Sequence, residues 1–320
     1  MMKKIFTIAL ITLSLNTIHA QTKVWFDTDL MIGLPERAPR EVDDGVTLIM
    51  ALKMPQIKIV GLSTVTYPDY GVGVAKKIID WHGKGQQIPL YKGSPKADDL
   101  GIENEATKAL YQALKKEKLT VLALGPVTNI ATLIKNHPDI IGQIDSIIMC
   151  AARTSDFHFK PGLETVTVYD YNYEKDTASM NVLLKSNVNL VFAGFESSYS
   201  LLIGKVDIDR LQTNNEGDKW LHSTLRLWQK RALTLFGVDG FIPYDCTVLG
   251  VITHPQYFKT CRNIPVDVVL KENDSKIAQK GLQIKPYLEV NYNFASQRKV
   301  QFVYKCLPGF EELIIETMGQ

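Results

Sequence analysis

Four aspartates lie close together near the N-terminus of this chain: Asp27 and Asp29, then Asp43 and Asp44, with Glu41 beside the second pair. Carboxylates that converge repel one another, so they either keep protons or recruit a cation. A ligand set made only of oxygens suits Ca²⁺ or Mg²⁺, whereas Zn²⁺ would require nearby His or Cys. Asp also caps helices well, so Asp43 and Asp44 could simply cap a helix that follows them. The residues alone leave both interpretations open.

The elements around these aspartates indicate how they are positioned. Residues 23–26 predict a short strand that ends at the first aspartate pair, and residues 57–65 predict a second strand rich in β-branched side chains. Residues 46–53 between them have the composition and apolar spacing of a helix. A strand, helix and strand in this order form a parallel βαβ unit, whose functional groups gather at the carboxyl ends of the strands.

The same alternation continues along the chain. We expect further strands at 88–91, 119–124, 144–149 and 188–192, and helices at 74–81, 105–116, 177–185 and 220–236, with one more opened by Pro126. Strands at 266–270, 282–290 and 300–304 are expected to be antiparallel and more exposed, with little functional weight. The predicted fold is therefore a single α/β domain with a mostly parallel, Rossmann-like open central sheet flanked by helices.

Composition narrows the class of ligand. The chain has 320 residues, of which 45% are hydrophobic and 22% charged, and no linker, repeat or low-complexity tract divides it. The formal net charge is +2 with acids and bases interspersed, so the basic face of a nucleic-acid binder is not visible. A small, uncharged or weakly charged ligand is easier to accommodate.

The N-terminus has the features of an export signal. Lys3 and Lys4 precede a largely apolar run at 5–15, and the segment ends at Ala20. We therefore predict a signal peptide at 1–20, a mature domain at 21–320 and a periplasmic or secreted protein that is free of the membrane after cleavage. A membrane anchor would need roughly 20 apolar residues, and the run at 5–15 is too short for that. The four cysteines match no zinc or redox spacing, so disulfides are permitted but not required.

Several blocks together resemble one family. The aspartate region, Asp27-Thr28-Asp29 followed by Val42-Asp43-Asp44-Gly45, is similar to the N-terminal signature of the inosine-uridine nucleoside hydrolases. Residues 122–131 resemble the Gly-Pro-Leu-Thr-Asn block of that family, and residues 147–149 its next strand. Asp170-Tyr171-Asn172 with Asp176 resembles its Glu-Phe-Asn block, and Tyr244-Asp245 its His-Asp motif. The blocks occur in family order, which chance does not produce.

The resemblance implies a calcium site and a general base. The ion would be held by the side chains of Asp29, Asp44 and Asp245 and by the backbone carbonyl of Leu124, together with the ribose 2′- and 3′-hydroxyls and one water. Asp29 would contact that water and act as the general base. Hydrolysis of an N-glycosidic bond forms an oxocarbenium-like sugar, which nearby carboxylates stabilise.

The resemblance also implies the sugar contacts. Asp43 and Asn172 would bind ribose hydroxyls with help from Asp170, and Asp27 would support the loop from behind the metal ligands. The expected activity is calcium-dependent release of free base from ribonucleosides. Members of this family are commonly dimers or tetramers, so a homo-oligomer is expected.

The chain departs from the family pattern at four places, one of which is a shorter version of the family's Gly-Gly-Asn loop at residues 66–70. Residues 31–42 form an insertion between the aspartate pairs, which we interpret either as a lid or specificity loop or as a solvated excursion. Asp170 replaces Glu and reaches less far towards the sugar. Tyr244 replaces the His expected to protonate the leaving base, and its ring could instead stack on a purine.

These departures give a slight preference for purine nucleosides and leave alternatives open. Trp228, Tyr199 and Phe236 could aid stacking, although aromatic residues at such spacing are more often core. His158 and His222 are the remaining histidines considered for the leaving-group side, with ordinary surface histidines the better expectation. The alternatives are a hydrolase of another riboside on the same scaffold, or a calcium-dependent nucleoside or sugar binder without catalysis.

Overall fold

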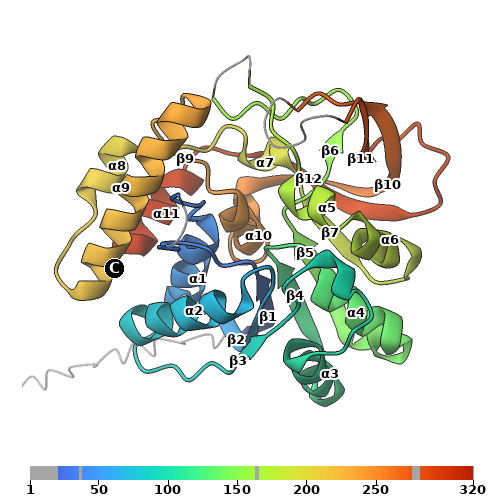
Figure 1. Ribbon diagram of the computed structural model, residues 1–320, viewed down its shortest axis with the longest axis horizontal. Helices are drawn as coiled ribbons and strands as arrows, with labels where there is room; N and C mark the ends of the chain where they lie inside the picture. The colour runs from blue at the N-terminus through green and yellow to red at the C-terminus, as the bar shows by residue number, and fades with distance from the viewer. Residues whose placement is uncertain (1–20, 36–37, 163–165, 276–281, 320) are drawn as a thin grey trace, which may run out of the picture.

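One large sheet organises the computed structural model, which describes residues 21–35, 38–162, 166–275 and 282–319 (Figure 1). Across the sheet, the described strands are β3 (Leu90–Lys92), β2 (Ile57–Thr64), β1 (Thr22–Thr28), β4 (Leu119–Ala123), β5 (Ile144–Met149), β7 (Leu190–Ala193), β12 (Lys299–Cys306), β10 (Phe258–Glu272), β11 (Ile284–Val290) and β6 (Arg153–Thr154). Neighbours from β3 to β12 are parallel, so the predicted fold class is confirmed.

Helices cover both faces of the sheet. One face carries α1 (Asp43–Lys53), α2 (Pro68–His82), α9 (Glu216–Phe236), α10 (Tyr244–Thr253) and α11 (Phe310–Gly319). The other carries α3 (Glu105–Lys116), α4 (Thr128–Asn136) and α6 (Thr177–Lys185) (Figure 1). Along β1, Val24 and Phe26 enter the first core and Trp25 the second. This alternation follows from the two-residue period of a strand that is buried on both sides.

Shorter elements lie in the connections between the larger ones. They are α5 (Tyr171–Lys175), α7 (Phe195–Ser198), α8 (Lys205–Arg210) and a small antiparallel pair, β8 (Ile203–Gly204) with β9 (Gly240–Phe241). Single-turn helices such as α5 are marginal by themselves, so they depend on capping and packing from their surroundings.

Two sequence predictions about elements need correction. The helix expected to open at Pro126 begins at Thr128. Residues 124–127 connect β4 to this helix, and Gly125 among them lies close to Asp29. The C-terminal strands are also more integrated than expected: β12 runs parallel to β7 and buries Phe302 within the central sheet. The pairing of β10 with β12 and with β11 is antiparallel, as predicted.

The predicted signal peptide lies outside the described residues, so its cleavage near Ala20 stays a prediction. Within residues 21–319, apart from the three internal gaps, no helix combines the length and apolar character needed to cross a membrane.

Candidate functional site

Three neighbouring parallel strands end at the same cavity. Asp29 follows β1, Leu124 follows β4 and Cys150 follows β5, and all three residues line this cavity. Parallel strands in an open α/β sheet bring their carboxyl ends to one edge, where ligands usually bind. Asp29, Asp43 and Asp44, singled out from the sequence, therefore lie at the edge of the sheet where ligands bind in folds of this kind.

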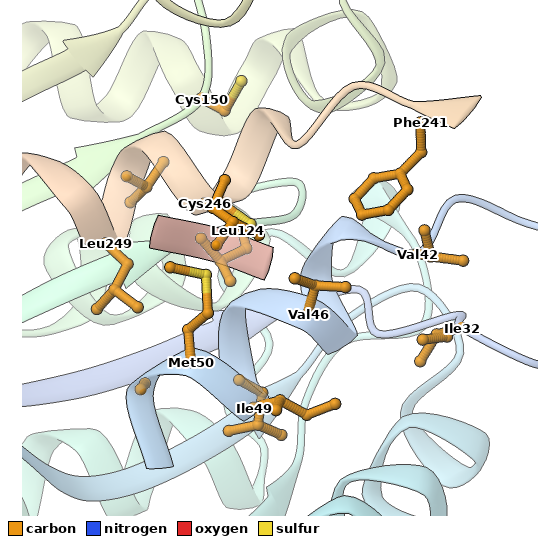
Figure 2. Close-up of a cluster of buried hydrophobic side chains, with 14 of the residues drawn as sticks. Ile32, Val42, Val46, Ile49, Met50, Leu124, Cys150, Phe241, Cys246 and Leu249 are labelled. Atoms are coloured by element: carbon orange, nitrogen blue, oxygen red, sulfur yellow. The ribbon is translucent and has the colours of Figure 1, made fainter. Parts of the chain in front are cut away.

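The N-termini of two helices face each other beside these strand ends. Figure 2 shows Val46 and Met50 of α1 packed with Cys246 and Leu249 of α10, which fixes the two helices together. The same arrangement brings the first turn of α1, which begins with Asp43 and Asp44, next to Tyr244 and Asp245 at the start of α10. Negative groups are stabilised at helix N-termini by the helix dipole.

The structure rejects the helix-cap interpretation of Asp43 and Asp44. The N-cap of α1 is Val42, and no side chain caps that helix. Asp43 Oδ2 instead accepts a hydrogen bond from the backbone N–H of Asp245 at 3.1 Å. Asp44 Oδ1 accepts one from the hydroxyl of Thr28. Both carboxylates are thus used to build the site.

Asp43, Asp44 and Asp245 form the tightest acidic grouping among the described residues. One carboxylate oxygen of each lies within 4.8 Å of one from each of the others, and all three residues are buried. The described residues place no Lys or Arg in an ion pair with any of them. Asp29 lies outside this grouping but lines the same cavity and interacts electrostatically with Asp43 and Asp44. The grouping could hold a metal ion through oxygen atoms alone.

The carboxylates have strongly perturbed pKa values. Burial, and then the charge of Asp43, raises the pKa of Asp29 to about 8. Burial raises the pKa of Asp43 to about 6. Burial and the neighbouring carboxylates raise the pKa values of Asp44 and Asp245 well above their usual range. Buried anions at this separation need protons or a cation, so the chemistry of the donor set fits a hard divalent ion.

The start of α5 forms another part of the cavity wall. Asp170 is the N-cap of this helix, and its carboxylate accepts hydrogen bonds from the backbone N–H groups of Tyr173 at 3.2 Å and Ala152 at 3.3 Å. Asn172 Nδ2 donates to the carbonyl of Leu124 at 3.0 Å. Burial, the largest effect, raises the pKa of Asp170 to about 6. Asp170, Asn172 and Leu124 all line the cavity.

Asp27 lies behind the cavity. Its Oδ1 accepts hydrogen bonds from Ser63 Oγ at 2.6 Å and from Asn129 Nδ2 at 2.8 Å. Burial raises its pKa to about 6, against the effect of these two donors. Asn129 also accepts from the backbone N–H of Ser94, so Asp27 belongs to a buried network that joins β1, β2 and α4.

The cavity itself has a volume of about 220 Å³. That is several times the roughly 30 Å³ that one water occupies in the liquid, so a small organic molecule can enter. Tyr244 lies in its wall with its ring edge-on to Phe159, at a centroid distance of 5.5 Å and an interplanar angle of 76°. Trp228 and Phe236 of α9 line the same space. The cavity is therefore lined by both carboxylates and aromatic side chains.

The insertion at residues 31–42 contributes to this cavity. Met31, Pro39, Arg40 and Glu41 are lining residues, and Ile32 is buried in the core. The described part of the insertion is therefore not a solvated excursion. Two of its residues, 36 and 37, lie outside the described part of the chain.

Some residues considered from the sequence lie elsewhere. Tyr199 is exposed and packs edge-on against Phe157, away from the cavity lining. His158 is exposed and pairs with Asp274, and His222 lies near Asp209. Neither histidine lines the cavity, as expected of ordinary surface histidines. Cavity residues that sequence reasoning missed include Arg231, Tyr169 and Phe159. Arg231 lies one helical turn after Trp228, the spacing that places two residues on one face.

Known proteins of the same kind match this chain over most of its length. The model of the family described as "Inosine-uridine preferring nucleoside hydrolase" matches residues 24–281. A probable uridine nucleosidase 2 of Oryza sativa subsp. japonica is 23% identical over 251 residues, which cover 68% of this chain and 72% of that protein. A pyrimidine-specific ribonucleoside hydrolase RihB of Shigella flexneri serotype 5b (strain 8401) is 21% identical over 253 residues, covering 68% and 77%. The solved structure of a purine-preferring ribonucleoside hydrolase from Gardnerella vaginalis is similar with a TM-score of 0.72 at 17% identity, covering 93% of this chain and 98% of that one.

Proposed function

The chain belongs to the inosine-uridine preferring nucleoside hydrolase family and is a ribonucleoside N-glycosyl hydrolase, and we propose that it acts with calcium and slightly prefers purine nucleosides. The observation that carries the proposal is the buried grouping of Asp43, Asp44 and Asp245 beside Asp29 at the end of the cavity. The carboxylates in the cavity suit a cation and a sugar diol, and the aromatic side chains in its wall suit a nucleobase.

The proposed calcium ligands are the carboxylates of Asp29, Asp44 and Asp245 and the carbonyl of Leu124. The donors are all oxygens, which a hard cation prefers, and two of the carboxylates sit at helix N-termini that face one another. When bound, calcium would hold the two ribose hydroxyls and a water and would neutralise the repulsion among the carboxylates. Asp43 belongs to the same grouping as Asp44 and Asp245, but we assign it to the sugar hydroxyls. Its carboxylate also holds the start of α10 by accepting a hydrogen bond from the Asp245 N–H.

The remaining chemistry belongs to side chains around the sugar. Asp29 accepts the proton of the attacking water, because it lies at the strand end that opens into the cavity. Asn172 and Asp170 are held at the start of α5, and they bind and orient the ribose from that part of the cavity wall. Carboxylates on both sides of the ring stabilise the positive charge that develops as the N-glycosidic bond breaks.

The base is proposed to lie between aromatic side chains. Tyr244, Trp228 and Phe236 line the cavity, and a purine offers a larger ring surface for stacking than a pyrimidine does. The relatives include both a purine-preferring and a pyrimidine-specific enzyme, so the proposed preference rests on these rings alone. Burial keeps the pKa of the Tyr244 phenol well above its usual range, which fits a stacking or hydrogen-bonding role better than proton donation.

We further propose that the protein is exported through its N-terminal 20 residues and works as a homo-oligomer in the periplasm or outside the cell. Mass spectrometry of the exported chain and light scattering of the purified protein would test these two points. A retained N-terminus would rule out the cleavage, and a monomer at micromolar concentration would rule out the oligomer.

The experiment that tests the activity is chromatography of free bases released from purine and pyrimidine ribonucleosides and their 2′-deoxy forms in the presence of calcium. Release is expected from ribonucleosides, fastest from a purine, and at least 100-fold slower from the deoxy forms, because a missing hydroxyl removes a contact made in the transition state. No release from any ribonucleoside would contradict the proposal and favour another riboside or a binding protein. Faster release from pyrimidines would overturn only the purine preference.

A further inference from the structure

A lysine on β11 is almost completely buried behind the sugar side of the cavity. The side chain of Lys285 is 1% exposed, and its Nζ lies 2.7 Å from Glu174 Oε1 and 2.6 Å from Ser275 Oγ. Glu174, on α5, is 3% exposed. A buried ammonium group is costly unless it is paired and hydrogen-bonded, so this pair must remain closed in the folded protein.

The same glutamate oxygen holds the start of α5. Glu174 Oε1 also accepts a hydrogen bond from the backbone N–H of Asp170 at 3.1 Å. Asp170 is the N-cap of α5, and Asn172 on this helix donates to the carbonyl of Leu124. A continuous chain of contacts therefore leads from Lys285 through Glu174 to two residues in the cavity wall.

A second acidic residue fixes the lysine from the other side. Asp274 lies 3.6 Å from Lys285 Nζ, accepts a hydrogen bond from the Tyr287 hydroxyl at 2.8 Å and pairs with Arg153 at 3.5 Å. The guanidinium of Arg153 lies over the ring of Phe195, a cavity residue, at 5.9 Å. Lys285, Arg153, Glu174 and Asp274 thus form one cluster, in which Asp274 is partly exposed and the other three side chains are buried. Lys285 of this cluster and the neighbouring Tyr287 belong to the C-terminal strand β11, for which the sequence predicted little functional weight.

We propose that Lys285 is a positioning residue for sugar binding: through Glu174 it fixes the start of α5 and thereby the Asp170 and Asn172 side chains that face the cavity. This inference rests on the proposed function, because it takes the ribose as the group bound by α5. A helix of five residues has little stability of its own, so its orientation depends on contacts such as these.

The same hairpin offers a control lysine, which is more exposed than Lys285, at 39% against 1%. Lys271 of β10 is the cross-strand partner of Lys285, and its Nζ pairs with the buried Glu289 at 2.7 Å. Its other hydrogen bond reaches the carbonyl of Ser155, so its contacts do not lead to α5. Replacing either lysine with methionine removes a hairpin ion pair, but only Lys285→Met should disturb the sugar contacts.

The test measures the dissociation constant of inosine by calorimetry, with calcium, in a chain that carries Asp29→Asn to prevent turnover. Lys285→Met is expected to weaken binding at least tenfold, and Lys271→Met less than threefold. The effects of Lys285→Met and Asn172→Ala should not add, because both remove the same contact. If Lys285→Met does not fold, as judged by circular dichroism, Glu174→Gln against Glu289→Gln provides the same comparison, with at least a threefold loss expected from the first.

The outcomes separate this inference from the proposed function. Equal affinities in the Lys285 and Lys271 variants, or additive effects of Lys285→Met and Asn172→Ala, would overturn the positioning role even if the wild-type chain hydrolyses nucleosides. Absence of base release by the wild-type chain, with the affinity loss confined to Lys285→Met, would overturn hydrolysis and support the positioning role.

Discussion

Asp29 combines the features that a general base in this site requires. It follows β1 directly, lines the cavity, and is close enough to Asp43 for their charges to interact. We predict that Asp29→Asn lowers kcat by at least about 100-fold while KM changes by less than about threefold, since a positioned base contributes on the order of 10² to 10⁴ in rate. Steady-state kinetics on inosine would check this. A variant with wild-type kcat would exclude the role.

Tyr244 is one of the aromatic residues in the cavity wall. Its ring lies edge-on to Phe159 and Phe195 and forms part of the wall. Tyr244→Leu is predicted to lower kcat/KM for inosine roughly three- to tenfold, the scale of one stacking contact, and to affect uridine less. Tyr244→Phe, which keeps the ring, serves as the control and should retain most of the activity. An equal loss for both nucleosides in Tyr244→Leu would argue against stacking on a purine.

At this scale the sequence was informative where residue type restricts chemistry. Aspartates clustered around one strand end indicated a site for a hard cation, and the structure places Asp29, Asp43 and Asp44 at one cavity. Asp245 could be added only through its resemblance to a family motif, because 200 residues separate it from Asp44 and spacing cannot reveal such a contact. Phe159 carried no signal, since aromatic residues are common in loops, and Arg231 could have been found only through its helical spacing from Trp228.

The junction between two strand ends controls how closely these side chains approach. Gly125 follows β4, and a Cβ atom there would lie 2.8 Å from both the backbone N and the Oδ1 of Asp29. Gly125→Ala is therefore predicted to displace Asp29 and lower kcat at least about tenfold, with a loss of about 1–3 kcal/mol in stability from overpacking. Gly142→Ala is the control, because a Cβ atom there meets no atom within 4 Å. Kinetics and chemical denaturation of both variants would measure the two effects, and full activity in Gly125→Ala would contradict the close approach.

Regular elements followed from the sequence, and their long-range pairing did not. The helices at 105–116 and 177–185 and the strand at 144–149 have the predicted bounds because apolar periodicity and capping residues mark them clearly. The helix α10 went unpredicted, since residues 245–250 are all buried and the helix lacks an amphipathic pattern. The placement of β12 between β7 and β10 depends on contacts distant in sequence, so the link from Lys285 to α5 was hidden.

For the whole molecule, the buried carboxylate of Asp29 couples the free energy of unfolding to pH. The pKa of Asp29 is raised from 3.8 to about 8, so between these values the folded protein without metal binds more protons than the unfolded chain. Stability must then fall as pH rises through this range. Calorimetry in EGTA is predicted to show the melting temperature falling from pH 6 to pH 9, with a smaller fall in Asp29→Asn. Calcium should flatten this dependence, because it replaces the protons. An identical pH profile in the wild type and Asp29→Asn would contradict a raised pKa of Asp29 as the cause of the pH dependence.

We propose that the aspartates of the cavity hold a calcium ion during hydrolysis of ribonucleosides. The most direct test is the rate of free-base release from inosine before chelation, after EGTA treatment, and after calcium is added back in excess. We predict that release is lost with EGTA and returns with calcium, and that Asp245→Ala shows no release under any of these conditions. Undiminished release in EGTA would contradict a role for calcium in this site.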